Sequence, residues 1–170
     1  MNISRFENQK DHFTLLKAIN ISEIKNQINL TLVGYGTNYK KIKNFISKNK
    51  IHAKIILNEK QINKFYRKAD LYVCSSLYEG LPTTVIEAAS NGLPIICSDF
   101  KSGSNEILKK GKAGYLFSIG NFKQLSKLLS KFYYNPKHFY KKEAICRKNL
   151  NRFNVKRNIN LFNSLINELF

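Results

Sequence analysis

Short apolar runs that alternate with segments of helix length constrain the fold of this chain most strongly. The runs are rich in β-branched residues and are continuous rather than alternating, which is typical of strands buried on both faces. Strands separated by helix-length segments form βαβ units, so the pattern predicts an α/β, Rossmann-like fold with a doubly wound parallel sheet. The expected strands cover residues 28–36, 52–57, 70–76, 93–99 and 114–118.

The segments between the expected strands carry helical signals. Apolar spacing predicts helices over 37–50 and 61–69, and a helix over 83–91 ends at an Asn-Gly pair, a common C-terminal signal. From residue 121 onward the sequence predicts helices only. A chain of 170 residues suits one domain with its own core, so residues 1–170 are expected to form a single domain whose 121–170 part is mainly helical.

The charge balance is strongly basic, because 29 Lys and Arg against 11 Asp and Glu give a formal net charge of +18. Such an excess suits a polyanionic or phosphate-bearing partner, or an anionic membrane surface. The lysines are scattered over the whole length, so a solvated basic surface is favoured over a dedicated polyanion site. No nucleic-acid-binding motif or basic and aromatic cluster is present, and no nucleic acid partner is expected.

The cysteines and histidines indicate neither a disulfide framework nor a metal site. Cys74, Cys97 and Cys146 form no CxxC pair, and the first two fall in apolar runs, where a free Cys acts as a small buried hydrophobe. The three histidines lack metal-ligand spacing, so no metal or other cofactor is expected. No apolar run approaches the ~20 residues of a membrane span, and no signal peptide is visible. A cytoplasmic location fits these features.

The stretch YEGLPTTVIEAASNGLP, residues 78–94, follows an expected strand and begins a helix. Pro82 suits the first helical turn, where its missing N–H costs little. The N–H groups around Leu81, Thr83 and Thr84 are then free, and together with the helix dipole they form an anion site that suits phosphate.

Two carboxylates flank this expected phosphate site. Glu87 lies about a turn and a half into the helix, where it can accept hydrogen bonds from hydroxyls beside a phosphate, such as those of a ribose. Glu79, in the loop, can do the same for a second polyol, so the pair suits a nucleotide-sugar. The alternative is that Glu79 caps the helix and Glu87 is an exposed helix residue, and spacing alone favours that alternative.

The flanking residues favour the ligand site. ADLYVCSSLYEGLPTTVIEAASNGLP, residues 69–94, resembles the signature of glycosyltransferase family 4, which are retaining enzymes of the GT-B fold. In that signature two glutamates with seven residues between them follow a strand. The resemblance implies that Glu79 orients the donor sugar, that Glu87 holds the ribose, and that the helix start around Gly80 binds the donor diphosphate.

The resemblance extends over most of the chain. SRFENQKDHFTLLKAI, residues 4–19, is similar to the opening of the family's C-terminal domain, which implies that Arg5 and Lys10 bind the donor diphosphate. LTLVGYGTNYKKI is similar to a family turn in which glycines, here Gly34 and Gly36, let the backbone approach the donor.

A further loop, CSDFKSGSNEIL, is similar to one that lies near the donor sugar in the family. Gly103 and Glu106 match it, and Ser102 stands where Gly is frequent. Leu57 stands where the base-binding loop usually begins with Gly, which leaves the nucleotide base open. The resemblance thus implies catalytic roles for Glu79, Arg5 and Lys10 and donor-binding roles for Gly34, Gly36, Gly80, Leu81, Pro82, Thr83, Thr84, Glu87 and Gly103.

The resemblance implies transfer of a sugar, with retention, from a nucleotide-sugar to a hydroxyl of a glycan or lipid-linked acceptor in cell-surface polysaccharide synthesis. The expected enzyme is a hexosyl- or N-acetylhexosaminyl-type transferase that uses a UDP-linked donor. The similarity covers the C-terminal donor-binding domain, so the N-terminal acceptor domain is expected to be absent. The alternatives are a non-catalytic nucleotide-sugar-binding remnant, or half of a split enzyme whose acceptor domain is a separate chain. Peripheral contact with the inner face of the membrane is compatible with the resemblance.

Overall fold

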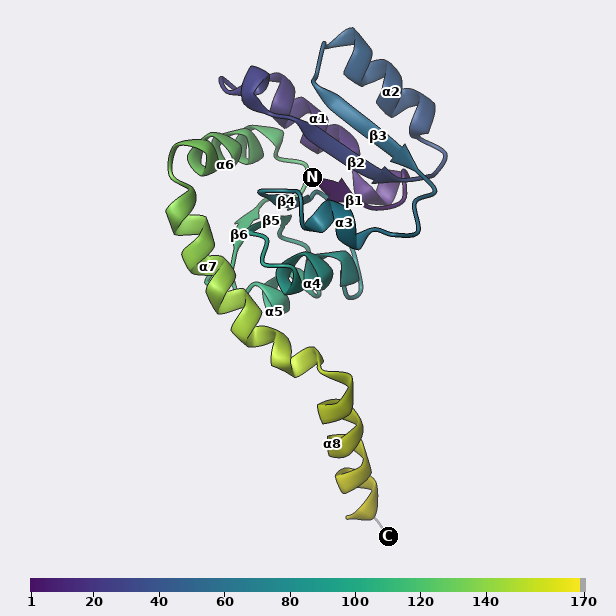
Figure 1. The fold of residues 1–170 in the computed structure, drawn as a ribbon, viewed down its shortest axis with the longest axis vertical. Helices are drawn as coiled ribbons and strands as arrows, with labels where there is room; N and C mark the ends of the chain where they lie inside the picture. The colour runs from purple at the N-terminus through teal and green to yellow at the C-terminus, as the bar shows by residue number, and fades with distance from the viewer. Residues whose placement is uncertain (169–170) are drawn as a thin grey trace.

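Parallel strands form the centre of the molecule in the computed structural model, which describes residues 1–168 (Figure 1). One group pairs in the order β1 (Asn2–Ile3), β2 (Leu30–Gly34) and β3 (Ala53–Leu57). The other pairs in the order β4 (Tyr72–Cys74), β5 (Ile95–Ser98) and β6 (Tyr115–Phe117). Each of these pairings is parallel, as the sequence predicts.

The two groups of strands meet at Met1. The nitrogen of Met1 donates to the carbonyl of Leu71 at 2.7 Å, and the N–H of Val73 donates to the carbonyl of Met1 at 2.9 Å. This reciprocal pattern is the hydrogen bonding of parallel strands, so the start of β1 pairs with β4. The strands therefore follow the order β3-β2-β1-β4-β5-β6, which is the Rossmann order, and the predicted doubly wound sheet is confirmed.

Both faces of the sheet are buried, each in its own apolar cluster. Val73 belongs to the first cluster, whereas its neighbours Tyr72 and Cys74 belong to the second, because successive side chains of a strand point to opposite faces. Residues of α1 (His12–Asn20), α2 (Tyr39–Lys48) and α6 (Phe122–Tyr134) pack in or against the first cluster. Residues of α3 (Asn63–Tyr66), α4 (Thr83–Ser90) and α5 (Ser104–Ile107) pack in the second.

Polar caps and proline determine where several helices begin. The carboxylate of Asp11 accepts hydrogen bonds from the Thr14 N–H at 3.2 Å and the Thr14 hydroxyl at 2.6 Å, and α1 begins directly after it. α6 ends two residues before Pro136, which is the first residue of α7 (Pro136–Asn149). Proline suits that position because the first N–H of a helix has no intrahelical partner.

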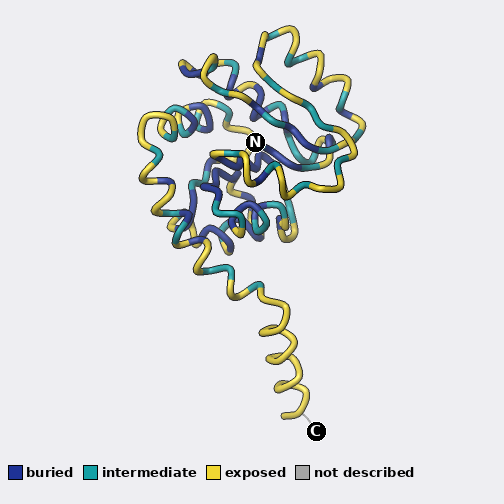
Figure 2. Tube along the Cα trace, viewed as in Figure 1, coloured by how far each residue is buried: buried dark blue, intermediate teal, exposed yellow. Residues whose placement is uncertain are grey.

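The C-terminal helix α8 (Val155–Asn167) extends away from the body of the molecule (Figures 1 and 2). It follows α7 through a short 3-10 turn at Leu150–Phe153. None of its described residues is buried, although its apolar residues recur at helical spacing. Its fold therefore rests on local helical bonds rather than on the two core clusters.

Several elements differ from the sequence-based expectations in length. The helix expected over 61–69 contains only the four residues of α3, because Tyr66 is its one buried anchor. Most strands are shorter than expected at both ends, as at β2, where the chain turns after Gly34, whereas β3 ends at Leu57 as expected. Helices α1 and α5 were not predicted, whereas α7 lies within the part from residue 121 onward that was expected to be helical.

His12 forms part of the packing between the loop after β1 and α1. Its Nε2 lies 3.0 Å from the Ser4 hydroxyl, which in turn donates to the Asn2 side chain at 2.8 Å. Its ring packs edge-on against Phe6, with 5.1 Å between the centroids. Burial, assisted by the nearby positive charge of Lys10, lowers the pKa of His12 to about 4.

We expect this buried histidine to make stability depend on pH. Because the folded-state pKa lies below the ordinary value of 6.5, the unfolded chain binds a proton that the folded chain does not between these two values. The contribution is therefore present above pH ~6.5 and declines toward pH ~4, by about 3 kcal/mol in total. Urea unfolding at pH 7 and pH 4.5 should show a smaller pH difference for His12→Gln than for the parent chain, and an NMR titration giving His12 an ordinary pKa would contradict the expectation.

Candidate functional site

The predicted site residues follow the carboxyl ends of four parallel strands. In a doubly wound sheet, ligands bind beyond these ends, at the point where the strand order reverses. That point lies between β1 and β4, whose following loops carry the charged residues of the site. β1 is followed by Arg5 and Lys10. β2 ends with Gly34 and is followed by Gly36, and β5 is followed by Gly103. The remaining predicted residues come after β4 and are Glu79, Gly80, Leu81, Pro82, Thr83, Thr84 and Glu87.

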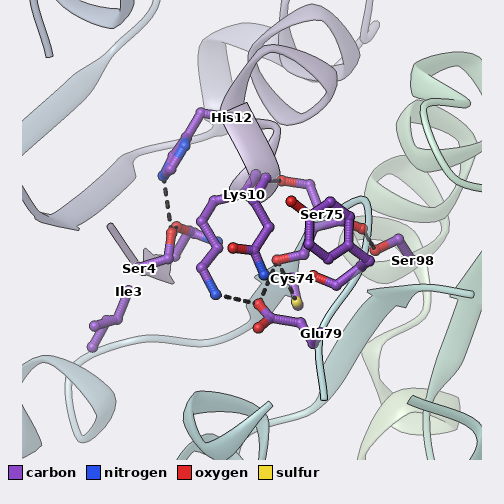
Figure 3. A network of polar contacts seen from close by, with 12 residues as sticks. Ile3, Ser4, Lys10, His12, Cys74, Ser75, Glu79 and Ser98 are labelled. Atoms are coloured by element: carbon purple, nitrogen blue, oxygen red, sulfur yellow. Dashed lines mark hydrogen bonds and ion pairs between the residues drawn. The ribbon is translucent and has the colours of Figure 1, made fainter. Parts of the chain in front are cut away.

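An ion pair between Lys10 and Glu79 joins the loops after β1 and β4 (Figure 3). The Lys10 ammonium contacts Oε1 of Glu79, and the Ser76 hydroxyl donates to the same oxygen at 2.8 Å. The side chains of Lys10 and Glu79 are only 15% and 13% exposed, so the pair is largely shielded from water. A charge in such a position interacts more strongly with a ligand than a surface charge does.

Main-chain contacts hold these two loops together independently of the ion pair. The Leu77 N–H donates to the carbonyl of Gln9 at 2.8 Å, and the Gln9 side chain donates to the carbonyl of Tyr78 at 2.9 Å. The Ser75 hydroxyl donates to the carbonyl of Lys10 at 3.1 Å. The position of Lys10 beside Glu79 is therefore fixed by the backbone as well as by charge.

Hydroxyl groups also attach the loop after β5 to the loop after β4. The Ser98 hydroxyl donates to the carbonyl of Ser76 at 2.5 Å, and the Ser102 hydroxyl donates to the carbonyl of Glu79 at 2.6 Å. Ser102 is the residue that stands where Gly is frequent in the resembling family, and here its hydroxyl makes a contact that Gly lacks. The sequence indicated Ser102 only as a replacement for Gly, and it gave no indication of Ser98.

The start of α4 offers unpaired backbone donors. Within the described residues, no hydrogen-bond acceptor takes the N–H groups of Leu81, Thr83 or Thr84. Pro82 is the N-cap residue and has no side-chain cap, and Leu81 and Thr83 are exposed. The N-terminal end of a helix with free N–H groups can bind an anion.

Gly103 permits the close approach of the loops after β4 and β5. Its φ of +79° lies in the left-handed region that favours Gly. A Cβ at this position would lie 2.6 Å from Cδ of Pro82 and 2.7 Å from the carbonyl oxygen of Gly80. A side chain here would therefore push the start of α4 away from the β5 loop.

Glu87 lies on α4, and its side chain is oriented by a tyrosine. The Tyr66 hydroxyl, from α3, donates to Oε2 of Glu87 at 2.9 Å. Burial and the negative charge of Glu87 raise the pKa of Tyr66, so this hydroxyl remains a donor at neutral pH. No sequence signal indicated Tyr66, which comes from a different helix.

The glycines at and after the end of β2, Gly34 and Gly36, lie against the loop that follows β1. A Cβ on Gly34 would lie 1.9 Å from the carbonyl oxygen of Ser4, so this residue lets the loop after β1 cross β2. Arg5, in that loop, is exposed and forms no ion pair within the described residues. The structure thus brings Lys10, Glu79 and the start of α4 together. Arg5 faces solvent, although it precedes Lys10 closely in the sequence.

The described residues offer neither a cluster of metal ligands nor a membrane-spanning helix. No group of three or more His, Cys, Asp and Glu side chains in the described part of the chain could hold a metal ion. None of the helices within residues 1–168 is both long and apolar enough to cross a membrane.

Similar proteins are found in bacteria and archaea. An uncharacterized glycosyltransferase of Methanocaldococcus jannaschii is 37% identical over 111 residues, which cover 64% of this chain and 27% of that protein. Protein CapJ of Staphylococcus aureus is 30% identical over 184 aligned positions, covering 98% of this chain and 45% of that protein. The chain therefore spans less than half the length of these curated relatives.

Solved structures share the fold. The catalytic domain of cholesterol-α-glucosyltransferase from Helicobacter pylori superposes with a TM-score of 0.75 and 26% identity, covering 88% of this chain and 96% of that one. Anabaena HepE in complex with UDP-glucose superposes with a TM-score of 0.86 and 19% identity, covering 98% of this chain and 48% of that one.

The comparison with protein families agrees with these similarities. Residues 1–152 match the family described as "Glycosyl transferases group 1". The match includes all six strands and the helices from α1 to α7. The chain therefore belongs to the glycosyl transferases group 1, and its fold is that of the C-terminal domain of a GT-B glycosyltransferase.

Proposed function

We propose that this domain binds a nucleotide-sugar at the carboxyl ends of its strands. It is the donor-binding domain of a retaining, family 4 glycosyltransferase in this proposal. The observation that carries the proposal is the shielded Lys10–Glu79 ion pair beside the unpaired N–H groups at the start of α4. A cation and free backbone donors suit the diphosphate, and a carboxylate next to them suits a sugar hydroxyl.

The diphosphate leaves with negative charge when the bond to the sugar breaks. Lys10, Arg5 and the backbone N–H groups of Thr83 and Thr84 stabilise that charge in this proposal. An ammonium has three donors, so Lys10 can contact a phosphate oxygen while it keeps its bond to Glu79. No metal ion is needed for this step, because the protein's own donors neutralise the leaving group.

Glu79 and Glu87 bind hydroxyls on either side of the diphosphate in this proposal. Tyr66 and Ser76 each fix one oxygen of a carboxylate, Oε2 of Glu87 and Oε1 of Glu79, and so orient these side chains. The second oxygen of each carboxylate is then available to accept from a ribose hydroxyl, at Glu87, or from the donor sugar, at Glu79. The acceptor hydroxyl can lose its proton to the departing phosphate.

A UDP-linked donor is favoured by the proteins that share the fold. Anabaena HepE has been solved with UDP and with UDP-glucose, and the pneumococcal O-GlcNAc transferase GtfA with UDP and GlcNAc. These similarities support a hexose or N-acetylhexosamine as the transferred sugar. A Campylobacter jejuni transferase that acts on a diphospho-undecaprenol sugar supports a glycan or lipid-linked acceptor, which we assign to cell-surface polysaccharide synthesis.

Binding without turnover is the second candidate for this chain by itself. The chain spans less than half of the relatives' length, so acceptor binding is proposed to need a further domain, in the same protein or as a separate chain. The net charge of +18 supports peripheral contact with an anionic inner membrane surface, where a cytoplasmic enzyme meets lipid-linked acceptors.

A donor panel tests the proposed function directly. We expect isothermal titration calorimetry to detect binding of a UDP-sugar and weaker binding of GDP- and ADP-sugars to the 170-residue chain. Release of UDP beyond slow hydrolysis, after an acceptor extract is added, would favour turnover over the binding-only candidate. Absence of binding by every nucleotide-sugar in the panel would contradict the proposal.

We expect Glu87→Ala to weaken UDP-sugar binding by about 10-fold to 100-fold, the cost of hydrogen bonds to a charged group. Tyr66→Phe keeps the carboxylate and should weaken binding less. Glu23→Ala, an exposed acid outside the site, provides the matched control. Calorimetry measures the affinities, and circular dichroism checks the fold. Equal affinity in Glu87→Ala and the parent chain would rule out the ribose role.

We expect Lys10→Gln to remove much of the preference for UDP over UMP, because the substitution deletes a cation next to the second phosphate. Affinity for UDP should fall at least about tenfold, while affinity for UMP changes little. Lys43→Gln, on the exposed face of α2, should leave both affinities unchanged. A uniform loss for UDP and UMP would instead indicate disruption of the loop.

A further inference from the structure

One side of α6 carries a row of lysines that the candidate site does not use. Between residues 122 and 132 of this helix, the exposed residues are Lys123, Lys127 and Lys131. They recur every four residues, so they lie about 6 Å apart along the helix, nearly one above the other. The buried residues of α6 lie on its opposite side, against the first core cluster. α6 itself lies at the periphery of the molecule, so the row faces solvent (Figure 1).

An exposed tyrosine completes the row. Tyr134, the last residue of α6, is 67% exposed. It follows Lys123 by three helical turns, because each turn takes about 3.6 residues, and so it lies on the same side of the helix. A tyrosine ring has an apolar body and a polar tip, which suits the boundary between water and an apolar phase. We call the surface formed by Lys123, Lys127, Lys131 and Tyr134 the α6 face.

Neighbouring acids do not neutralise the charge of the α6 face. Residues 107–142 contain nine lysines and neither Asp nor Glu. Within the described residues, none of the three lysines of the face forms an ion pair. Glu23 lines a shallow hollow together with Lys127, but the two side chains form no ion pair in the described structure. The α6 face is therefore a local excess of positive charge, not a helix surface covered by salt bridges.

A second ammonium lies close to Lys131 at one edge of the face. Nζ of Lys131 and Nζ of Lys142, on α7, lie 5.0 Å and 4.9 Å from the centre of the same Tyr115 ring. Burial, together with the positive charge of Lys131, lowers the pKa of Lys142. Two like charges held at one ring repel each other, and an anion bound beside both of them relieves that repulsion.

The shape of the α6 face selects its partner. The lysines extend over about 12 Å of one helix, so a single phosphate cannot contact all three, whereas a layer of anionic headgroups can. A soluble phosphate polymer would match the row of charges, but it would leave the apolar part of the Tyr134 ring in water. A lipid surface accommodates both the charges and the ring.

The position of α6 relative to the candidate site also suits a membrane. α6 begins shortly after the carboxyl end of β6, which is the end of the sheet at which the candidate site lies. From there the helix runs back toward the amino ends of the strands. A membrane that lies along α6 therefore passes beside the end of the sheet where the donor is proposed to bind.

We infer that the α6 face binds the phosphate headgroups of an anionic lipid membrane, with α6 parallel to the membrane plane and Tyr134 at the level of the headgroups. The inference assigns a surface to the proposed peripheral membrane contact and rests on that part of the proposed function, but it does not depend on donor binding. Attraction between charges supplies most of the affinity, so salt weakens the binding.

Vesicle sedimentation tests the inference with the full chain. The probe is a vesicle of equal parts phosphatidylcholine and phosphatidylglycerol, and the reference vesicle contains phosphatidylcholine only. We expect the chain to bind the anionic vesicle, to release it as NaCl is added, and not to bind the neutral one. The triple variant with Lys123→Gln, Lys127→Gln and Lys131→Gln should bind about 100-fold more weakly, since each lysine near the surface contributes about fivefold.

A matched variant separates the α6 face from the net charge of the chain. Lys41→Gln, Lys43→Gln and Lys48→Gln remove the same charge from exposed positions of α2, and together they should weaken vesicle binding by less than about threefold. The sequence contains no tryptophan, so Tyr134→Trp places a single fluorescent reporter on the α6 face. Its emission should shift to shorter wavelengths when anionic vesicles are added.

Several results would overturn the inference. They are failure of the parent chain to bind the anionic vesicle, equal losses of affinity in the two triple variants, and an unchanged emission of Tyr134→Trp on vesicles. Binding of soluble polyphosphate without binding of vesicles would overturn it as well, because the partner would then be a phosphate polymer. UDP affinity, measured in parallel on the same variants, tests the donor proposal separately.

Discussion

The main-chain pairing of β1 with both β2 and β4 is the contact on which the rest of the structure depends. The Met1–Leu71 and Val73–Met1 hydrogen bonds join two three-stranded halves into one sheet. The same strand directs the following loop across Gly34, where only a residue without a side chain leaves room, and onto the loop after β4. Lys10 meets Glu79 because β1 lies between these neighbours.

Charge acts at two distances around the candidate site. The net charge of +18 gives a long-range field that attracts anions, but it is spread over the whole surface and selects no geometry. The geometry of the candidate site comes from short contacts, in which Ser76 and Tyr66 orient the two glutamates and Glu79 holds Lys10. Because the Lys10–Glu79 pair is partly buried, removing one partner leaves an uncompensated charge, so the pair also stabilises the junction of the two loops.

The order of elements and the strand-to-helix segment that carries the candidate site could be predicted from the sequence, because each is a contiguous stretch of the chain. The apolar runs of β2 to β6 and the segment that starts α4 are local patterns, and the structure confirms them. The contacts of Tyr66, Ser98 and Ser102 could not be predicted, since each joins residues that lie 21 to 23 positions apart in the chain. The length of α3 was overestimated, because tertiary contacts rather than spacing determine where it ends.

The polar groups at the two ends of β1 differ in how they find hydrogen-bond partners. The loop groups at the carboxyl end are polar and partly exposed, so water can satisfy them when no ligand is present. The strand edges at the amino end face apolar walls, where an unpaired N–H is more costly.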